Sequence, residues 1–341
     1  MRNNLKLASV AMAVGAVWLT AFAGPSLAAE KEVTIGYQQV ISPWKVAIVD
    51  GVLEKATGYK INWRAFNTGP EAINAFASGS VDITDAGSPI FAAGMSKGLD
   101  MELFWIIDDI ASAEALAVRN GSGIKAPQDL KGKKIAVPFG STTHFHLMFA
   151  LEQFKINPKD VEILNMKPPA IAAAWDRGDI DAAFVWDPTL GHIKESGHVI
   201  LSSGQLCVWG KCTFDGLVAN STWASKHPDF MTKFVKVLDD SNQAYRKNPA
   251  AWTADSEPVQ KIVKLVGSNG ENAVKVLALY GFPDLKEMAS DKWLGGGKDG
   301  GAARALYFTA QFMKEQGKIP NVLDDYSKYV NPEWAIKAQA Q

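Results

Sequence analysis

The stretch Ala136-Val-Pro-Phe-Gly-Ser-Thr-Thr-His144 joins the end of a short apolar strand to the start of a helix. Residues 134–139 are mostly apolar and predict the strand, and residues 145–154 have the apolar spacing of a helix. The first turn of a helix leaves backbone N–H groups without partners and carries a partial positive charge. The turn can therefore hold an anion, with support from its hydroxyl groups. Alternatively, Ser141 or Thr142 is an ordinary helix cap.

Strand and helix patterns alternate on both sides of this stretch. Strands are expected at residues 33–37, 60–66, 81–84, 101–107, 114–119, 134–139, 161–165, 180–186, 198–202 and 214–220. Helices are expected between them at residues 43–57, 70–77, 89–96, 143–154, 169–176 and 188–195. This alternation is typical of an α/β protein with mostly parallel sheets. The remainder is mainly helical and is expected to pack back on the first part of the chain.

An internal similarity indicates a duplication. At a constant offset of 99 positions, five residues match five others: Pro70, Phe76, Gly79, Val81 and Asp82 match Pro169, Trp175, Gly178, Ile180 and Asp181. Such a repeat predicts two lobes of related βαβαβ build, and the chain is also long for one hydrophobic core. We expect residues 29–115 and 216–341 to form lobe 1 and residues 116–215 to form lobe 2. Chance similarity between two βαβ units is the alternative.

Residues 1–28 have the composition of a secretory signal peptide. A positively charged start without acidic residues precedes the apolar run 7–23, and the small residues Ser26 and Ala28 mark a cleavage site after residue 28. The sequence therefore predicts export to the periplasm.

The charge balance argues against a nucleic-acid partner. The full chain has a formal net charge of −1 at pH 7. Residues 1–28 carry two of the positive side chains and no negative one, so the mature chain would have a net charge of −1 − 2 = −3. Neither a basic patch for nucleic acid nor a polybasic membrane segment is expected.

The only two cysteines, Cys207 and Cys212, lie five residues apart. In an oxidising compartment, such a pair is expected to form a disulfide that stiffens a loop. A metal site would need further ligands, and no histidine is close in sequence. We expect no metal and no cofactor.

Sequence motifs of enzymes are missing from the chain. It has no Gly-x-Ser-x-Gly nucleophile elbow, no phosphate-binding loop, no His-Glu-x-x-His zinc motif and no dinucleotide-binding glycine pattern. The five histidines are scattered, and only His144 is expected to point toward a cleft between the lobes. Missing motifs do not exclude catalysis, but they give it no positive support, and we expect a binding protein and not an enzyme.

Two turns are expected to face that cleft, because ligands of open α/β sheets bind beyond the carboxyl ends of the strands. Gly87-Ser88 follows a strand of lobe 1, and Gly140 to Thr143 follows a strand of lobe 2. One turn from each lobe predicts an anion clamped between them.

Acidic and aromatic residues add a second kind of contact. Glu114 and Asp215 lie where the chain crosses between the lobes, and a buried carboxylate there needs a cation. For either acid alone, a structural salt bridge is the commoner role. Trp186 and Trp209 flank the predicted cleft, where an aromatic face can attract an ammonium group. Together these residues predict a ligand that carries both signs of charge.

The chain resembles the taurine-, sulfonate- and nitrate-binding receptors of ABC importers over nearly its whole mature length. The most specific segments are residues 135–144, 167–181 and 185–188. Shorter similar segments are residues 112–116, 209–210, 213–215 and 312–318.

The resemblance implies the type II periplasmic binding protein fold, with two lobes that close on a ligand. It also implies a monomer that docks on a membrane permease served by a cytoplasmic ATPase. The implied ligand is taurine or a related sulfonate. Ser88, Thr142 and Thr143 would hold the sulfonate, and Asp215 with Glu114 would hold the ammonium. The candidate ligand-binding residues are Gln38, Ser88, Glu114, Thr142, Thr143, His144, Trp186 and Asp215.

Three alternatives stay open at this point. The receptor could bind another alkanesulfonate or a small zwitterion. The same two-lobed scaffold could carry an enzyme. The protein could also be a ligand-sensing partner of a membrane receptor.

Overall fold

A computed structural model describes residues 31–340. The predicted signal peptide and its cleavage site lie outside the described residues.

The first of two five-stranded sheets has the order β2-β1-β3-β10-β4. Its strands are β1 (Glu32–Gln38), β2 (Lys60–Phe66), β3 (Ile83–Gly87), β4 (Glu102–Asp109) and β10 (Phe214–Ala219).

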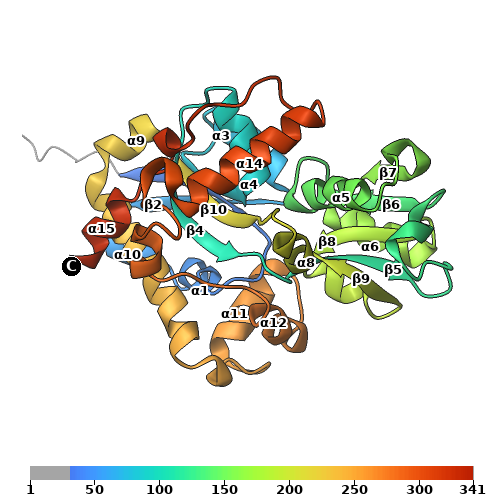
Figure 1. Cartoon of the computed structure of the whole chain (residues 1–341). Helices are drawn as coiled ribbons and strands as arrows, with labels where there is room; N and C mark the ends of the chain where they lie inside the picture. Colours follow the sequence, from blue (N-terminus) through green and yellow to red (C-terminus); the bar gives the residue numbers. More distant parts are fainter. Residues whose placement is uncertain (1–30, 341) are drawn as a thin grey trace, which may run out of the picture. The chain divides into compact units, whose positions relative to one another are not determined.

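The second sheet repeats this arrangement with the order β7-β6-β8-β5-β9 (Figure 1). Its strands are β5 (Glu114–Arg119), β6 (Lys134–Val137), β7 (Glu162–Asn165), β8 (Ala182–Trp186) and β9 (Gly197–Ser202). The chain thus crosses from the first sheet to the second between β4 and β5, and returns between β9 and β10.

Both sheets are mixed: four of the five strands in each run in the same direction, as the prediction of mostly parallel sheets requires, and one strand in each runs in the opposite direction. β1 pairs in parallel with β2 and β3, and β6 pairs in parallel with β7 and β8. By contrast, β10 runs antiparallel to β3 and β4, and β5 runs antiparallel to β8 and β9. The two antiparallel strands are those that arrive from the other sheet. They enter at the edge where the parallel strands end, and therefore run in the opposite direction.

Short helices connect the strands. They are α1 (Lys45–Val49), α2 (Val52–Thr57), α3 (Gly69–Ala77), α4 (Ser88–Ser96), α5 (Thr142–Gln153), α6 (Pro168–Arg177), α7 (Thr189–Ile193) and α8 (Ser203–Val208). The single helix predicted at residues 43–57 is in fact the pair α1 and α2. Gly51 separates them because its φ of 59° lies in the left-handed region, which interrupts a right-handed helix.

The C-terminal part is helical and packs mainly on the first sheet, as the sequence predicted (Figure 1). Its helices are α9 (Ser221–Lys226), α10 (Pro228–Lys247), α11 (Glu257–Val266), α12 (Gly270–Leu277), α13 (Leu285–Ala289), α14 (Gly301–Glu315) and α15 (Glu333–Gln339). Short 3₁₀ turns occur at Pro127–Leu130, Pro158–Asp160, Pro249–Ala251, Gly297–Asp299 and Ser327–Tyr329. Within residues 31–340, no helix has the length and apolar character that crossing a membrane requires.

The 99-residue repeat is visible in the strand positions and hydrogen bonds. β3 spans residues 83–87 and β8 spans residues 182–186, so both ends are 99 positions apart. Just before β3, Asp82 Oδ2 accepts a hydrogen bond of 2.9 Å from the N–H of Thr34. Just before β8, Asp181 Oδ2 accepts one of 2.8 Å from the N–H of Lys134. The similarity is therefore a duplicated structural unit and not a chance match.

Candidate functional site

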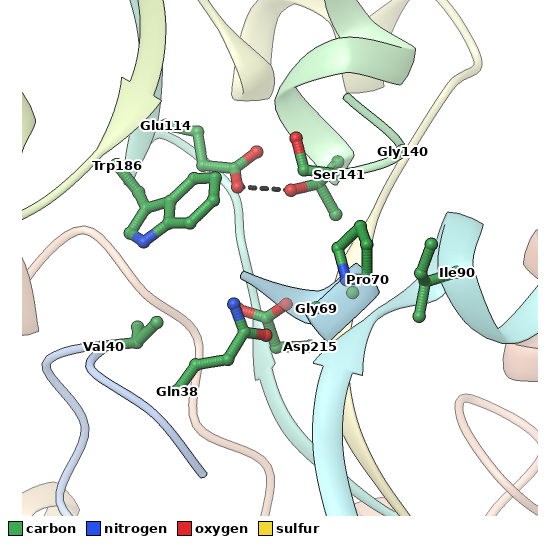
Figure 2. A pocket seen from close by; sticks show the side chains of 12 residues that line it. Gln38, Val40, Gly69, Pro70, Ile90, Glu114, Gly140, Ser141, Trp186 and Asp215 are labelled. Carbon is green, nitrogen blue, oxygen red and sulfur yellow. Dashed lines mark hydrogen bonds between the residues drawn. The ribbon is translucent and has the colours of Figure 1, made fainter. Parts of the chain in front are cut away.

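A narrow cavity lies between the two sheets. Residues of both sheets line it: Gln38, Val40, Gly69, Pro70, Gly87, Ile90, Glu114, Gly140, Ser141, Thr142, Trp186 and Asp215 (Figure 2). Five of the eight candidate residues are among them.

Three helices begin at this cavity. The lining residues include the first residues of α3, the residue before α4 and the first residue of α5. Ser141 caps α5 by accepting a hydrogen bond of 3.2 Å from the N–H of His144. α4 has no side-chain cap, so its start is open to an external acceptor. Because each helix start carries a partial positive charge, this side of the cavity favours an anion.

Glu114 opens β5 and is only 3% exposed. Its Oε2 accepts a hydrogen bond of 3.2 Å from Ser203 Oγ, and its Oε1 accepts one from Thr142 Oγ1. Burial, and secondarily the charge of Asp215, raises the pKa of the Glu114 carboxyl to about 8. Glu114 therefore takes up a proton readily when no cation is near.

Asp215 lies near the start of β10, opposite Gly87 in the sheet register, and its side chain faces the cavity. Burial, followed by the nearby charge of Asp85, raises its pKa to about 7, and Lys45 opposes that shift. A ligand cation beside this carboxylate would relieve the cost of its burial.

Behind Asp215 lies a buried group of charged residues that the sequence interpretation missed. Lys45 Nζ lies 3.3 Å from Asp85 Oδ2, and both side chains are almost fully buried. Asp108 is the register neighbour of Asp215 on β4, and neither of its buried carboxyl oxygens has a hydrogen-bond partner among the described residues. Burial and the charge of Asp215 raise the pKa of Asp108 well above its usual value. With Glu114, the group has four carboxyls and one cation, so the cavity favours a positive charge.

Asp85 also shapes the cavity wall. Its Oδ1 accepts a hydrogen bond of 2.7 Å from the N–H of Gln38, which holds the end of β1 in place. Charged residues within otherwise apolar strands, such as Asp85 and Asp108, are the sequence signal that could have identified this group.

Three candidate residues lie behind the cavity wall. Ser88 Oγ accepts a hydrogen bond of 3.4 Å from the N–H of Phe214, and Thr143 Oγ1 lies 2.8 Å from Ser141 Oγ. His144 Nδ1 accepts a hydrogen bond of 3.1 Å from the N–H of Gly140, and burial lowers the pKa of this imidazole to about 4. These side chains support the turns that line the cavity, and their role as ligand contacts stays a prediction.

The predicted disulfide between Cys207 and Cys212 is present, with a Cα–Cα distance of 4.0 Å. It closes the loop that contains Trp209, whose ring packs edge-on against Phe154 at 5.8 Å. Trp209 is 46% exposed and does not line the cavity. Among residues 31–340, no group of three or more His, Cys, Asp or Glu side chains is placed to hold a metal ion.

The two halves of the cavity touch closely. A Cβ atom at Gly87 would clash with Thr142 Cγ2, and one at Gly140 would lie 3.2 Å from Pro70 Cγ. Outside the cavity, Lys167 forms an ion pair with Glu71 across the two halves. These contacts bring the anion-favouring helix starts and the carboxyl groups around one small space.

The chain matches the protein-family model described as NMT1/THI5 like over residues 55–252. It is also similar to the taurine-binding periplasmic protein of Escherichia coli (strain K12). The two are 38% identical over 298 residues, which cover 87% of this chain and 91% of that protein.

Two solved structures indicate how widely this fold is used. The alkanesulfonate-binding protein SsuA from Xanthomonas axonopodis pv. citri, bound to MOPS, is similar with a TM-score of 0.72 and 24% identity, over 87% of this chain and 97% of that chain. The desulfurization enzyme DSZB is similar with a TM-score of 0.64 and 15% identity, over 91% and 99% of the respective chains. The predicted two-lobed α/β fold is confirmed, and the same fold also occurs in an enzyme.

Proposed function

Because this chain belongs to the NMT1/THI5-like family and is a relative of a taurine-binding periplasmic protein, we propose that it is the solute-binding protein of an ABC importer. Its ligand in this proposal is taurine, which carries an ammonium and a sulfonate two carbons apart. The protein captures taurine and delivers it to the membrane permease of the importer.

One observation carries the choice of ligand: the cavity combines an anion-favouring side with an excess of buried carboxyls. The starts of α4 and α5 receive the sulfonate through backbone N–H groups and the Thr142 hydroxyl. Asp215 receives the ammonium, with Glu114 close by. The ring of Trp186 forms a wall beside the ammonium.

Binding and closure are coupled in this proposal. Residues 29–115 and 216–341 form one lobe and residues 116–215 the other, and the two crossings between the sheets form the hinge. A ligand with two charged ends contacts both lobes at once, so it stabilises the closed state over the open one. The permease then recognises the closed shape.

The proposal includes export and partners. Residues 1–28 act as the signal peptide, the mature chain works in the periplasm as a monomer, and a cytoplasmic ATPase drives the permease. Two relatives whose names describe periplasmic binding proteins support this part of the proposal.

Calorimetric titration of ligand-free mature protein tests the ligand. We expect tight one-to-one binding of taurine, with butanesulfonate and β-alanine at least about 100-fold weaker. Butanesulfonate lacks the ammonium group, and β-alanine has a carboxylate in place of the sulfonate. Binding of butanesulfonate as tightly as taurine would contradict the proposal that Asp215 binds the ammonium group. Failure of all three ligands to bind to folded protein would overturn the proposal.

The protein is proposed to bind taurine without converting it. The enzyme with the same fold makes this worth testing directly. After a long incubation with the protein, taurine should be recovered unchanged and no sulfite should appear. Release of sulfite in proportion to protein concentration would favour the enzyme.

A further inference from the structure

Trp186 lies between two cavities. It lines the site described above and also a second cavity that is larger and more open. Among the described residues, Trp186 is the only one that lines both. The two cavities therefore adjoin at Trp186, and we treat its indole as the wall between the small inner space and the larger outer one.

The position of this wall is well defined. Trp186 ends β8, is 6% exposed and belongs to the apolar cluster of the second sheet, against which Val40 also packs. The next residue, Asp187, is held by two hydrogen bonds of 2.8 Å, from the N–H of Gly191 and from Asn272 Nδ2. Because α12 carries Asn272, residues from both halves of the molecule hold the end of β8.

The outer cavity has the lining of a site for an uncharged group. Pro168, Pro169 and Ala172 at the start of α6 give it an apolar side, and Asn67 and Thr189 give it polar atoms. No Asp, Glu, Lys or Arg side chain is among the residues that line it. An alkyl chain or a saturated ring would fit there without burying an unpaired charge.

The wall lies at one end of the inner cavity. Trp186 is the register partner of Glu114, whereas the anion-favouring turn at Gly140 and Ser141 lies on the other side of the Glu114 carboxyl (Figure 2). A ligand with its sulfonate at that turn directs its nitrogen toward Trp186. A substituent on the nitrogen would then meet the indole.

We propose that Trp186 determines the ligand size at the nitrogen end, and that the outer cavity is a latent subsite for an uncharged N-substituent. This inference rests on the proposed taurine-binding function. The wild-type protein accepts the unsubstituted two-carbon zwitterion and excludes N-substituted aminoethanesulfonates. Removal of the indole joins the two cavities and admits them.

The test uses taurine and N-cyclohexyltaurine, a taurine whose nitrogen carries a saturated six-membered ring. At pH 7.5 both nitrogens are protonated, so the two ligands differ in size and not in charge. We expect wild-type protein to bind taurine at least about 100-fold more tightly than N-cyclohexyltaurine. Trp186→Ala should bind N-cyclohexyltaurine at least about tenfold more tightly than wild type does, and should bind taurine more weakly than wild type does.

A second substitution tests whether the cyclohexyl ring lies in the outer cavity. In the Trp186→Ala background, Ala172→Trp fills the outer cavity from α6 and should remove the gain for N-cyclohexyltaurine while taurine binding stays unchanged. Trp209→Ala is the matched control, because Trp209 lines neither cavity, and it should change neither affinity. If Trp186→Ala does not fold, Trp186→Leu gives the same comparison with a smaller cavity.

Two results would overturn the inference. One is wild-type protein that binds both ligands equally. The other is a folded Trp186→Ala variant that binds taurine without any gain for N-cyclohexyltaurine. Failure of wild-type protein to bind taurine at all is a different result, because it removes the proposed function itself.

Discussion

The two sheets place one acidic side chain at the same point of the fold but surround it differently. Asp215 pairs with Gly87, the last residue of β3, and Glu114 pairs with Trp186, the last residue of β8. Gly87 and Trp186 are 99 positions apart, so the two acids are equivalent positions of the duplicated unit.

Their neighbours differ in what they offer a carboxylate. Glu114 accepts hydrogen bonds from two hydroxyl groups, whereas no hydrogen bond to the Asp215 carboxyl is found among the described side chains of the cavity. Asp215 also has the unpartnered carboxyl of Asp108 beside it. We infer that the backbone of the duplicated unit determines where each carboxyl group lies. The side chains around that carboxyl determine whether it can bind a cation. Asp215 is free to receive a cation, and Glu114 is held within the wall.

The largest effect should come from Asp215→Asn. It should weaken taurine binding by at least about 100-fold, because loss of one partner of a buried charge pair typically costs 2–5 kcal/mol. Butanesulfonate, which has no ammonium, should change little. Glu114→Gln should weaken taurine by only about tenfold, because the amide keeps the size and one acceptor. Calorimetric titration of both variants measures the difference, and equal losses would contradict the distinction between the two acids.

The close contact between the halves should give the next largest effect. Gly87→Ala should weaken taurine by about 10- to 100-fold, because the new methyl group meets Thr142 Cγ2 and opposes closure. Gly87 has an ordinary extended conformation with a φ of −79°, so the backbone itself tolerates alanine.

The double variant Gly87→Ala with Thr142→Ser is the matched control. Serine keeps the hydroxyl but lacks Cγ2, so it should recover most of the lost affinity. Small-angle X-ray scattering with and without taurine should show closure recovered in the double variant. No recovery would mean that the clash is not the cause.

A smaller effect is expected from pH. Asp215 has a raised pKa of about 7 in the ligand-free protein, and a bound ammonium would lower it. Taurine binding then releases a proton near this pKa, so the affinity should fall as the pH is lowered from 8 to 6, by up to about tenfold per unit. Asp215→Asn should remove the part of the pH dependence centred near pH 7 and leave only the part centred near pH 8 that Glu114 contributes. A flat wild-type profile would argue against a carboxylate that titrates in this range.

The smallest effect concerns stability without ligand. The pKa of Glu114 is raised to about 8 in the folded protein, above its ordinary value of 4.5. The neutral Glu114 carboxyl therefore contributes to the free energy of unfolding. This contribution is fully present below pH 4.5 and is lost as the pH rises through about 8. Glu114→Gln cannot ionise, so at pH 9 it should be more stable than wild type by about 1 kcal/mol, a rise in melting temperature of about 2–4 °C.

Thermal unfolding of ligand-free protein at pH 5 and pH 9 measures this difference. The gain should be much smaller at pH 5, where the carboxyl of the folded wild-type protein is neutral. A gain of the same size at both pH values would point to packing rather than to charge.

Much of the fold could be predicted because its signals are local. The strand and helix patterns, the repeat at Asp82 and Asp181, and the cysteine spacing all depend on residues close in sequence. The direction of β5 and β10 was not predicted, because the pairing of a strand depends on where the chain enters the sheet. The break at Gly51 was also missed, since a glycine within a helical pattern can continue the helix or end it.

The candidate site was predicted in part for a similar reason. Glu114, Thr142 and Asp215 stand next to recognisable turns or crossings, and each lines the cavity. Lys45, Asp85 and Asp108 were missed, although a charged residue within an apolar strand is itself a signal at Asp85 and Asp108. Their importance comes from lying together behind Asp215, although they are on α1, β3 and β4.

The sequence by itself determined the family, the two-lobed α/β build, the disulfide and the two acids at the crossings. Each of these depends on residue types at fixed spacings along the chain. Only the tertiary structure decided which groups line the cavity, how three aspartates come to lie around one buried lysine, and that Trp186 lines two cavities. Burial and charge coupling act over a few ångströms in space, and residues such as Lys45 and Asp215 are brought that close only by the packing of distant segments.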